Sequence, residues 1–197
     1  MNAAPRYVRK GNPQRDADVA RSTSVSRWTG GRRRSTELSS PRPAARSVPT
    51  RLNGMMNPNY RFSSDVAEID RDQVHRWISE QSYWAPGRSR SRQDAAIDGS
   101  RNFGVYDTDT SRQVAYARVI TDGVTFAWLC DVFVDPTVRG HGIGKALITG
   151  ILEECEPLGL RRIALSTDDA HGLYSNLGFT ALDTADTWME RIVNPGV

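Results

Sequence analysis

The sequence predicts one folded domain of the α/β (α+β) class, in which helices pack on a central sheet, preceded by an extension that does not fold. Two observations carry this prediction. From about residue 57 onward, segments with a helical period and segments with a strand period of hydrophobicity follow one another. Before that point Arg, Ser, Pro and Gly dominate, and no hydrophobic period is visible. The region 57–197 is long enough to bury a single core of ordinary size.

Caps and turn residues divide the folded region into elements. Asp70 precedes a segment in which Val74, Trp77 and Ile78 share one helical face, so a helix is predicted to begin there. The pattern changes from helix to strand several times along the chain. In order, the predicted elements are a strand at 60–68, a helix at 71–81, a short helix at 91–100, strands at 102–107, 112–121 and 124–135, a helix at 142–155, a strand at 161–167, a short helix at 168–176, and strands at 179–184 and 187–193.

The segment VTFAWLCDVFVD carries the strongest strand signal. Regular alternation would place the even-numbered residues from Val124 to Val134 on one face and the odd-numbered residues from Thr125 to Phe133 on the other. Both faces are largely apolar, which predicts a central strand covered on both sides. Asp131 is the exception, because an unpaired carboxylate inside an apolar strand is costly.

The segment VRGHGIGKAL joins this strand to the next helix through three glycines, Gly140, Gly142 and Gly144. The first N–H groups of a helix have no intrahelical partner and carry partial positive charge. Glycine lets an anion approach the backbone closely. The turn therefore predicts a phosphate or pyrophosphate site, with Arg139 and Lys145 adding positive charge at its rim.

Two familiar phosphate-binding patterns fail at this turn. The nucleotide P-loop, G-x-x-x-x-G-K-[ST], meets Arg139 in place of its first glycine and Ala146 in place of its hydroxyl residue. The dinucleotide pattern, G-x-G-x-x-G, meets Lys145 in place of its third glycine. The pattern that is present is R-x-x-G-x-G.

Together with a second motif, this pattern resembles the GNAT superfamily of N-acetyltransferases. The second motif is A-x-x-x-Y-x-x-x-G-F, which lies about 35 residues after the first. The resemblance covers roughly residues 60–193, along which the order of elements agrees. It implies a GNAT-like mixed and mostly antiparallel sheet flanked by helices. The residues that fill the two motifs are Arg139, Gly142, Gly144, Ala170, Tyr174, Gly178 and Phe179.

The resemblance implies that acetyl-coenzyme A is the cosubstrate, and we expect no metal. Thr167 stands where family members often have an Asn that contacts the coenzyme, so this contact is lost, made by the hydroxyl, or replaced by a helix cap. His141 is expected to contribute its backbone, and Lys145 either meets a phosphate or is solvated. The residues expected to bind the coenzyme are Phe133, Val134, Arg139, Gly140, His141, Gly142, Ile143, Gly144, Lys145 and Thr167.

Two residues are candidates for the chemistry of acetyl transfer. In the resembled family the tyrosine at the position of Tyr174 protonates the departing sulfur, and a phenol of pKa near 10 can donate to a thiolate whose acid has a pKa near 8.5. The alternative is a tyrosine that only packs beneath a short helix. Asp131 is a candidate base for the incoming ammonium. The alternative is that Arg118 or backbone amides satisfy its carboxylate. The resemblance also implies a bulge in this strand that admits the pantetheine.

The loop SYWAPGRS walls the acceptor site in the resembled family. Tyr83, Trp84 and Arg88 are therefore expected to bind the acceptor. The folded region 57–197 carries 14 Lys/Arg and 20 Asp/Glu, a net charge of −6, which mildly favours a cationic acceptor. A small-molecule amine and a protein amine both remain open.

The two cysteines, Cys130 and Cys155, both lie in apolar patterns. They predict buried thiols, a reducing cytoplasm, and direct transfer in a ternary complex without a covalent intermediate. No Cys/His cluster has the spacing of a zinc site, and no apolar run approaches the roughly 20 residues of a membrane span. We expect a cytoplasmic monomer or homodimer without a membrane partner.

The extension, residues 1–56, carries 12 Lys/Arg and 3 Asp/Glu, a net charge of +9. We expect it to be disordered. It is interpreted as an arginine arm for nucleic acid or another anionic surface, an organelle transit peptide, or, as the favoured alternative, a non-functional extension with translation beginning at Met55 or Met56. The sequence thus predicts an N-acetyltransferase domain at 57–197. Its rivals are a non-catalytic acyl-coenzyme A-binding module and nucleic-acid binding through the arm, with nucleic acid the less favoured partner.

Overall fold

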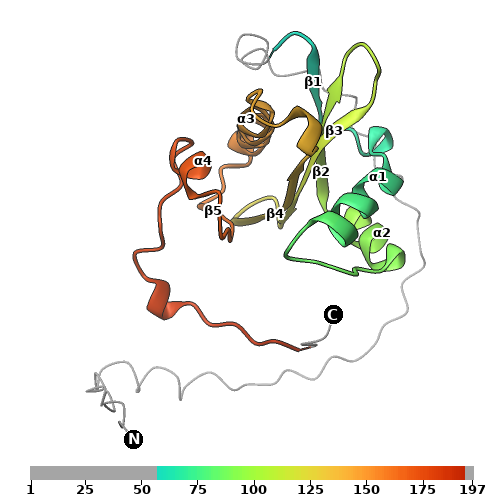
Figure 1. The fold of residues 1–197 in the computed structure, drawn as a ribbon. Coiled ribbons are helices and arrows are strands. Elements are labelled where there is room, and N and C mark those ends of the chain that lie inside the picture. The colour runs from blue at the N-terminus through green and yellow to red at the C-terminus, as the bar shows by residue number, and fades with distance from the viewer. Residues whose placement is uncertain (1–56, 194–197) are drawn as a thin grey trace, which may run out of the picture. The chain divides into compact units, whose positions relative to one another are not determined.

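A computed structural model of the chain describes residues 57–193, so the predicted extension over 1–56 lies outside the described residues. Within the described part, five strands form one sheet in the order β1-β2-β3-β4-β5. Neighbouring strands run antiparallel except β4 and β5, which are parallel. Helices cover both faces of this sheet (Figure 1). The predicted class, a mixed and mostly antiparallel sheet flanked by helices, is confirmed.

Most elements lie where the sequence predicts them. Asp70 accepts a hydrogen bond from the Gln73 N–H at 2.9 Å, which confirms it as the cap of the first helix. That helix continues into a π-helical turn, Trp77–Gln81. The strands are β1 Tyr60–Ser63, β2 Arg101–Asp107, β3 Gln113–Thr121, β4 Phe126–Val134 and β5 Arg162–Ala164, and the helices are α1 Arg71–Arg76, α2 Arg90–Asp98, α3 Ile143–Cys155 and α4 His171–Ser175.

The core on one face of the sheet is built around α3. Leu147, Ile148 and Ile151 are completely buried there, as expected for the apolar stripe of an amphipathic helix. Gly150 lies in the same helix, where an added Cβ would come within 2.6 Å of the Phe62 ring on β1. The absence of a side chain at this position thus sets how closely α3 packs on the sheet.

The core on the opposite face is smaller and is built around α1, its π-helical turn and α2. Trp77 stacks on Phe133 of β4 with ring centroids 5.3 Å apart. Ile78, Ile97 and Tyr116 also belong to this second core and are fully buried. The central strand is therefore covered on both sides, as predicted.

Strand β4 departs from regular alternation at Asp131. Tyr116 of β3 pairs with Phe133, whereas Arg118 pairs with Cys130, so two residues of β4, Asp131 and Val132, lie opposite the single residue Ala117 of β3. Asp131 lies in this bulge with a φ of +53°. An extra residue in one strand reverses the facing of the residues beyond it. The predicted face assignment is correct before the bulge and wrong after it.

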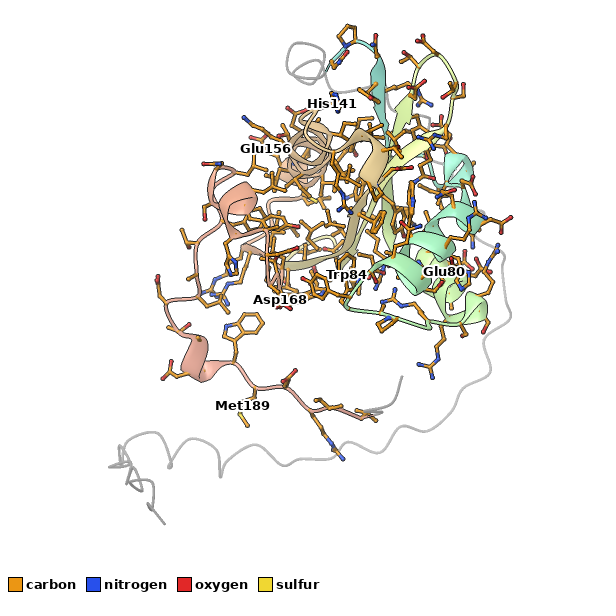
Figure 2. The ribbon with its side chains drawn as sticks, viewed as in Figure 1. Glu80, Trp84, His141, Glu156, Asp168 and Met189 are labelled. Carbon is orange, nitrogen blue, oxygen red and sulfur yellow. The ribbon has the colours of Figure 1, made fainter. Side chains whose placement is uncertain are left out.

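The two predicted strands at the C-terminal end, 179–184 and 187–193, are not formed. Among the described residues the last strand is β5, and the chain after α4 contains only a short 3-10 turn, Ala185–Thr187. Trp188 contacts the sheet, where its ring lies 6.4 Å from that of Phe126. Met189 is 95% exposed, and Figure 2 shows it away from the sheet. Strand propensity alone does not form a strand without a neighbour to pair with.

Candidate functional site

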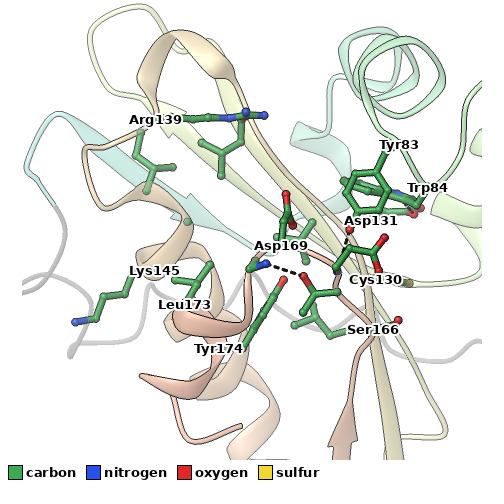
Figure 3. A pocket seen from close by; sticks show the side chains of 18 of the residues that line it. Tyr83, Trp84, Cys130, Asp131, Arg139, Lys145, Ser166, Asp169, Leu173 and Tyr174 are labelled. Carbon is green, nitrogen blue, oxygen red and sulfur yellow. Dashed lines mark hydrogen bonds between the residues drawn. The ribbon is translucent and has the colours of Figure 1, made fainter. Parts of the chain in front are cut away.

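A cavity of about 860 Å³ lies where β4, the glycine turn, α4 and the loop 82–89 meet. In Figure 3, Arg139 and Lys145 lie at one end of the cavity, and Tyr83 and Trp84 lie at the other. Tyr174 lies between the two ends. The sequence motifs that are far apart along the chain therefore line one space.

The glycine turn forms one wall of this cavity. Gly140 and Gly142 adopt φ values of +84° and +77°, which residues other than glycine rarely adopt. A Cβ at either position would meet no atom within 4 Å, so the space in front of the turn is open. Such a turn fits an anionic group that approaches the backbone.

The N-terminus of α3 forms part of the same wall, and the first N–H groups of a helix have no intrahelical partner. Ala146 is the residue whose N–H bonds back to the Gly142 carbonyl, at 2.9 Å. The N–H groups of Ile143, Gly144 and Lys145 precede it, and all three residues line the cavity. Because helix N-termini carry partial positive charge, this arrangement fits a phosphate or pyrophosphate.

Gly144 faces the interior of the cavity. An added Cβ would lie 3.6 Å from Val134 and 3.7 Å from Leu173, both at ordinary contact distance. A side chain there would take up cavity volume without displacing the backbone.

The charged residues of the turn differ in their surroundings. Arg139 donates from Nε to the Val134 carbonyl at 3.0 Å, and its guanidinium lies over the Phe133 ring. His141 is exposed, and its Nδ1 lies 3.2 Å from the Val138 carbonyl. His141 and Phe133 do not line the cavity, whereas the other eight predicted coenzyme residues do.

Tyr174 reaches the cavity from α4. Its ring packs edge-on against Phe179 at 5.7 Å between centroids, and the side chain is 93% buried. Within residues 57–193 its hydroxyl has no hydrogen-bond partner, and it lines the cavity. Burial, with smaller contributions from Tyr83 and Asp169, raises the pKa of Tyr174 to about 12. The phenol therefore keeps its proton throughout the ordinary pH range.

Thr167 closes the turn that leads into α4, and α4 itself has no side-chain cap, since its N-cap residue is Ala170. The Thr167 hydroxyl accepts a hydrogen bond from the Ala170 N–H at 3.1 Å, just before α4 begins. Neither Asp168 nor Asp169 caps the helix, so the predicted start of the helix is two to three residues early. Thr167 also lines the cavity.

The carboxylate of Asp131 is paired with two arginines. Arg118 donates to it from Nε at 2.6 Å, and Arg88 donates from Nη1 at 2.5 Å. Burial alone would raise the pKa of Asp131, but the hydrogen bonds and charges of Arg88 and Arg118 outweigh it and hold this pKa below its ordinary value. The alternative in which Arg118 satisfies Asp131 therefore has structural support.

The loop 82–89, which the sequence predicts to bind the acceptor, contributes two aromatic residues to the cavity wall. Tyr83 and Trp84 are 53% and 40% exposed and meet edge-to-face at 4.9 Å. The Tyr83 hydroxyl accepts a hydrogen bond from the Asp168 N–H at 3.2 Å. Arg88, the third predicted acceptor residue, does not line the cavity, because its guanidinium is engaged with Asp131.

Several wall residues were not foreseen. Cys130 was predicted to lie in the core, but it is only partly buried and lines the cavity beside Asp131, unlike Cys155, which is buried. Burial raises the pKa of the Cys130 thiol to about 11. Cys130 lies before the bulge on the same partly exposed side of β4 as Trp128, and both residues line the cavity. The other unforeseen wall residues include Trp128, Ser166 and Leu173.

No metal site is visible in the part of the chain that the structure describes, since no three His, Cys, Asp or Glu side chains gather there. None of the helices between residues 57 and 193 has the length and apolarity to cross a membrane.

Comparisons with known proteins agree with one another. The model of the acetyltransferase (GNAT) family matches residues 71–179. A protein of Gibberella zeae that is named as an acetyltransferase is 30% identical over 141 residues, which make up 61% of this chain and 78% of that protein. Serotonin N-acetyltransferase 2, chloroplastic, of Oryza sativa subsp. japonica is 34% identical over 98 residues, which make up 48% of this chain and 49% of that protein.

A solved structure has the same fold. The crystal structure of a GNAT-family acetyltransferase from Xanthomonas campestris pv. campestris superimposes with a TM-score of 0.65 at 43% sequence identity. The match covers 69% of this chain and 94% of that chain.

Proposed function

Because the chain belongs to the acetyltransferase (GNAT) family and is an acyltransferase, we propose that it transfers an acetyl group from acetyl-coenzyme A to a primary amine by direct attack in a ternary complex. One observation carries this proposal. A single cavity joins an open helix N-terminus, which suits a pyrophosphate, to the unpartnered hydroxyl of Tyr174 and to an aromatic and acidic end.

The residues around the glycine turn fit the coenzyme. Open space lies in front of Gly140 and Gly142, and the residues at the start of α3 line the cavity. Their backbone N–H groups would hold the pyrophosphate, and Arg139 and Lys145 add positive charge at the same end. The coenzyme supplies an activated acetyl thioester. We include Val134 and Thr167 in the binding wall, because both line the cavity.

Tyr174 is proposed as the group that stabilises the departing sulfur. Its hydroxyl is protonated at any working pH, since burial raises its pKa to about 12, and it faces the cavity. A phenol with so high a pKa acts best as a hydrogen-bond donor that shares its proton with the sulfur in the transition state. Its ring is fixed by Phe179, so the donor is preorganised.

Direct transfer is proposed in preference to an acetyl-cysteine intermediate. Cys130 lies in the cavity wall, but burial raises its pKa to about 11. Because only the thiolate is a good nucleophile, this thiol is poorly suited to attack a thioester at neutral pH. The amine is therefore the nucleophile.

The acceptor end favours an amine that carries a positive charge before it reacts. Tyr83 and Trp84 offer ring faces to a cation, and the carboxylates of Asp168 and Asp169 line the same cavity. The relative from rice is named for serotonin, a primary amine joined to an aromatic ring through a two-carbon chain. Small-molecule amines and protein amines both stay within the proposal.

Calorimetric titration of acetyl-coenzyme A into the full chain tests this function. We expect micromolar affinity in the unmodified protein and a large loss of affinity in Gly144→Val, whose side chain fills the cavity. Gly172→Val is a matched control, because an added Cβ there meets nothing within 4 Å and Gly172 does not line the cavity. No binding to the folded, unmodified chain would refute the proposal.

The same preparation is then offered a panel of amines that includes serotonin, a polyamine and a lysine-containing peptide, with release of free coenzyme A as the readout. Acetylation of one class assigns the acceptor. Tight binding of acetyl-coenzyme A with no transfer to any amine would favour a non-catalytic binding module instead.

A further inference from the structure

The carboxylate of Asp131 makes contacts beyond one ion pair to the proposed acceptor loop, residues 82–89. Arg88 reaches it with two nitrogens, Nη1 to Oδ2 at 2.5 Å and Nη2 to Oδ1 at 3.2 Å. The indole N–H of Trp84 donates to Oδ1 at 3.3 Å. Arg118 on β3 donates to Oδ2 from the other side. Asp131 thus joins two strands to the acceptor loop through a single carboxylate.

We propose that Asp131 is a positioning residue rather than the base, and that its pairing with Arg88 holds the acceptor loop against the bulge of β4 at the acceptor end of the cavity. The significance of the loop for acceptor binding rests on the proposed function. The pairing itself rests only on the contacts of Asp131.

The geometry of Asp131 is unfavourable for a base. Both oxygens already accept hydrogen bonds, four in all from Trp84, Arg88 and Arg118, and the side chain is only 3% exposed. A base needs a free lone pair that faces the proton it takes. The lowered pKa of this carboxyl points the same way.

Residues of α1 and α2 fix the orientation of Arg88. Its Nη1 also donates to Oε1 of Gln93, which is fully buried in α2, at 3.0 Å. His75 of α1 lies with Nε2 3.0 Å from the Arg88 carbonyl. Contacts to α1 and α2 therefore hold Arg88 in place for its pairing with Asp131. Its planar guanidinium also matches a carboxylate better than the ammonium group of a lysine would.

The other half of the loop lacks such support. Tyr83 and Trp84 are too exposed to be held by core packing. Their fixed points are the Trp84 bond to Asp131 and the Tyr83 bond to the Asp168 N–H. Loss of the Asp131 pairing should therefore loosen this half first, next to Cys130.

The reactivity of Cys130 offers a test that needs no acceptor. Arg88→Met is compared with the unmodified full chain for the rate at which N-ethylmaleimide labels Cys130, with the site identified by peptide mass. By charge alone, removal of Arg88 would raise the pKa of the Cys130 thiol and slow labelling, because Arg88 lowers that pKa. A loosened loop predicts the opposite, an acceleration of about tenfold through local opening.

Two further variants, and the buried Cys155 as an internal reference for unfolding, make the labelling result unambiguous. Arg90→Met is the matched control, since Arg90 pairs with Asp72 and Asp94 and not with Asp131, and its labelling rate should stay unchanged. Arg88→Lys retains the charge but loses the fork, so a smaller acceleration is expected. If Arg88→Met also exposes the buried Cys155, the fold has opened, and Arg88→Lys then decides. Labelling of Cys130 that is unchanged or slower in both Arg88 variants would overturn the proposal.

The amine acetylated in the panel supplies a second readout. A positioning role predicts a higher KM for that amine in Arg88→Met, with an unchanged affinity for acetyl-coenzyme A and an unmoved acidic limb of the pH profile of kcat/KM. If Asp131 were the base, loss of Arg88 would move this limb to higher pH. Should no amine be acetylated, the proposed function fails, while the labelling rates still decide whether the loop depends on Arg88.

Discussion

The Tyr174 side chain combines a fixed ring with a free hydroxyl. The ring is held against Phe179, and the hydroxyl faces the cavity without a partner among residues 57–193. A tyrosine that only packed under α4 would have no reason to direct its polar atom into a cavity. The motif A-x-x-x-Y-x-x-x-G-F located this residue in the sequence, and its geometry supports a role in catalysis.

Tyr174→Phe should lower kcat by about 10²- to 10⁴-fold and leave the affinity for acetyl-coenzyme A unchanged. The ring and its packing remain, and only the donor is removed. Steady-state turnover and calorimetry measure the two quantities. Tyr106→Phe is the control, because the buried Tyr106 hydroxyl has no partner within residues 57–193 and Tyr106 does not line the cavity. Turnover within a few-fold of the unmodified enzyme would contradict the assignment.

Asp131 should contribute stability in a pH-dependent way. Its folded-state pKa is lowered, so its contribution is fully present above its unfolded pKa of about 3.9 and is lost as the pH falls through the lowered value. Asp131→Asn leaves Arg88 and Arg118 without a carboxylate partner, at a cost of about 3–5 kcal/mol near neutral pH.

The measurement is the free energy of unfolding in urea between pH 7 and pH 3. The difference between the unmodified chain and Asp131→Asn should shrink toward the acidic end. Asp183→Asn, a change at an exposed residue, should show no such trend. A difference for Asp131→Asn that is independent of pH would mean that the charge of Asp131 is not what stabilises the fold.

The residues that the sequence identified are those set by motifs, and the ones it missed depend on three-dimensional context. Gly142 and Tyr174 stand at fixed places in short motifs. Cys130 was expected in the core, and no motif marks it as a residue of the cavity wall. Arg88 was expected to bind the acceptor, whereas its pairing with Asp131 joins residues 43 positions apart and has no local motif.

At the scale of the elements, the glycine turn requires glycine at two positions for two different physical reasons. Gly142 requires a left-handed backbone, with a φ of +77°. Gly144 has ordinary helical geometry and instead faces the cavity, where a Cβ would be in normal contact with its neighbours. Gly142 is therefore needed for the backbone conformation of the turn, and Gly144 is needed to keep the cavity open.

Gly142→Ala should therefore lower the free energy of unfolding by about 1–2 kcal/mol, the cost of a left-handed conformation for alanine. Gly144→Ala should leave it unchanged or raise it by up to about 1 kcal/mol, because alanine favours a helix more than glycine does. Urea denaturation of both variants measures these changes. Equal destabilisation by the two substitutions would contradict the separation of roles.

The accuracy of the sequence prediction differed between elements for physical reasons. Helix α3 has a strong apolar period and a cap that is local in sequence, and it was predicted within one residue. The segments 179–184 and 187–193 have strand-like residues but find no ladder within the described chain, and β5 offers only three paired residues. Strand formation depends on such pairing more than on composition.

At the scale of the whole molecule, charge is divided unevenly along the sequence. The positive residues concentrate in 1–56, and residues 57–197 carry a net charge of −6. All the proposed site residues lie between Tyr83 and Tyr174. The catalytic domain is therefore proposed to be 57–197. Its cytoplasmic location stays a prediction, and the relative from rice is named chloroplastic.

Deletion of residues 1–56 should leave the affinity for acetyl-coenzyme A and the turnover of the accepted amine unchanged, because no proposed site residue lies there. Calorimetry and turnover of the two chains measure this. Binding of nucleic acid that is steeply salt-dependent in the full chain and absent after deletion would instead assign the arginine arm its own function. Loss of coenzyme affinity would contradict the proposed domain boundary.

The bulge of β4 has a consequence for how remote sequences are aligned. Ala127 and Phe133 are both odd-numbered and apolar, yet Ala127 faces the α3 core and Phe133 faces the core of α1 and α2. An alignment that follows alternation through the whole strand would therefore match one half of it to the wrong face. A homologue without the extra residue needs a gap at Asp131 or Val132, so each half of the strand must be aligned in its own register.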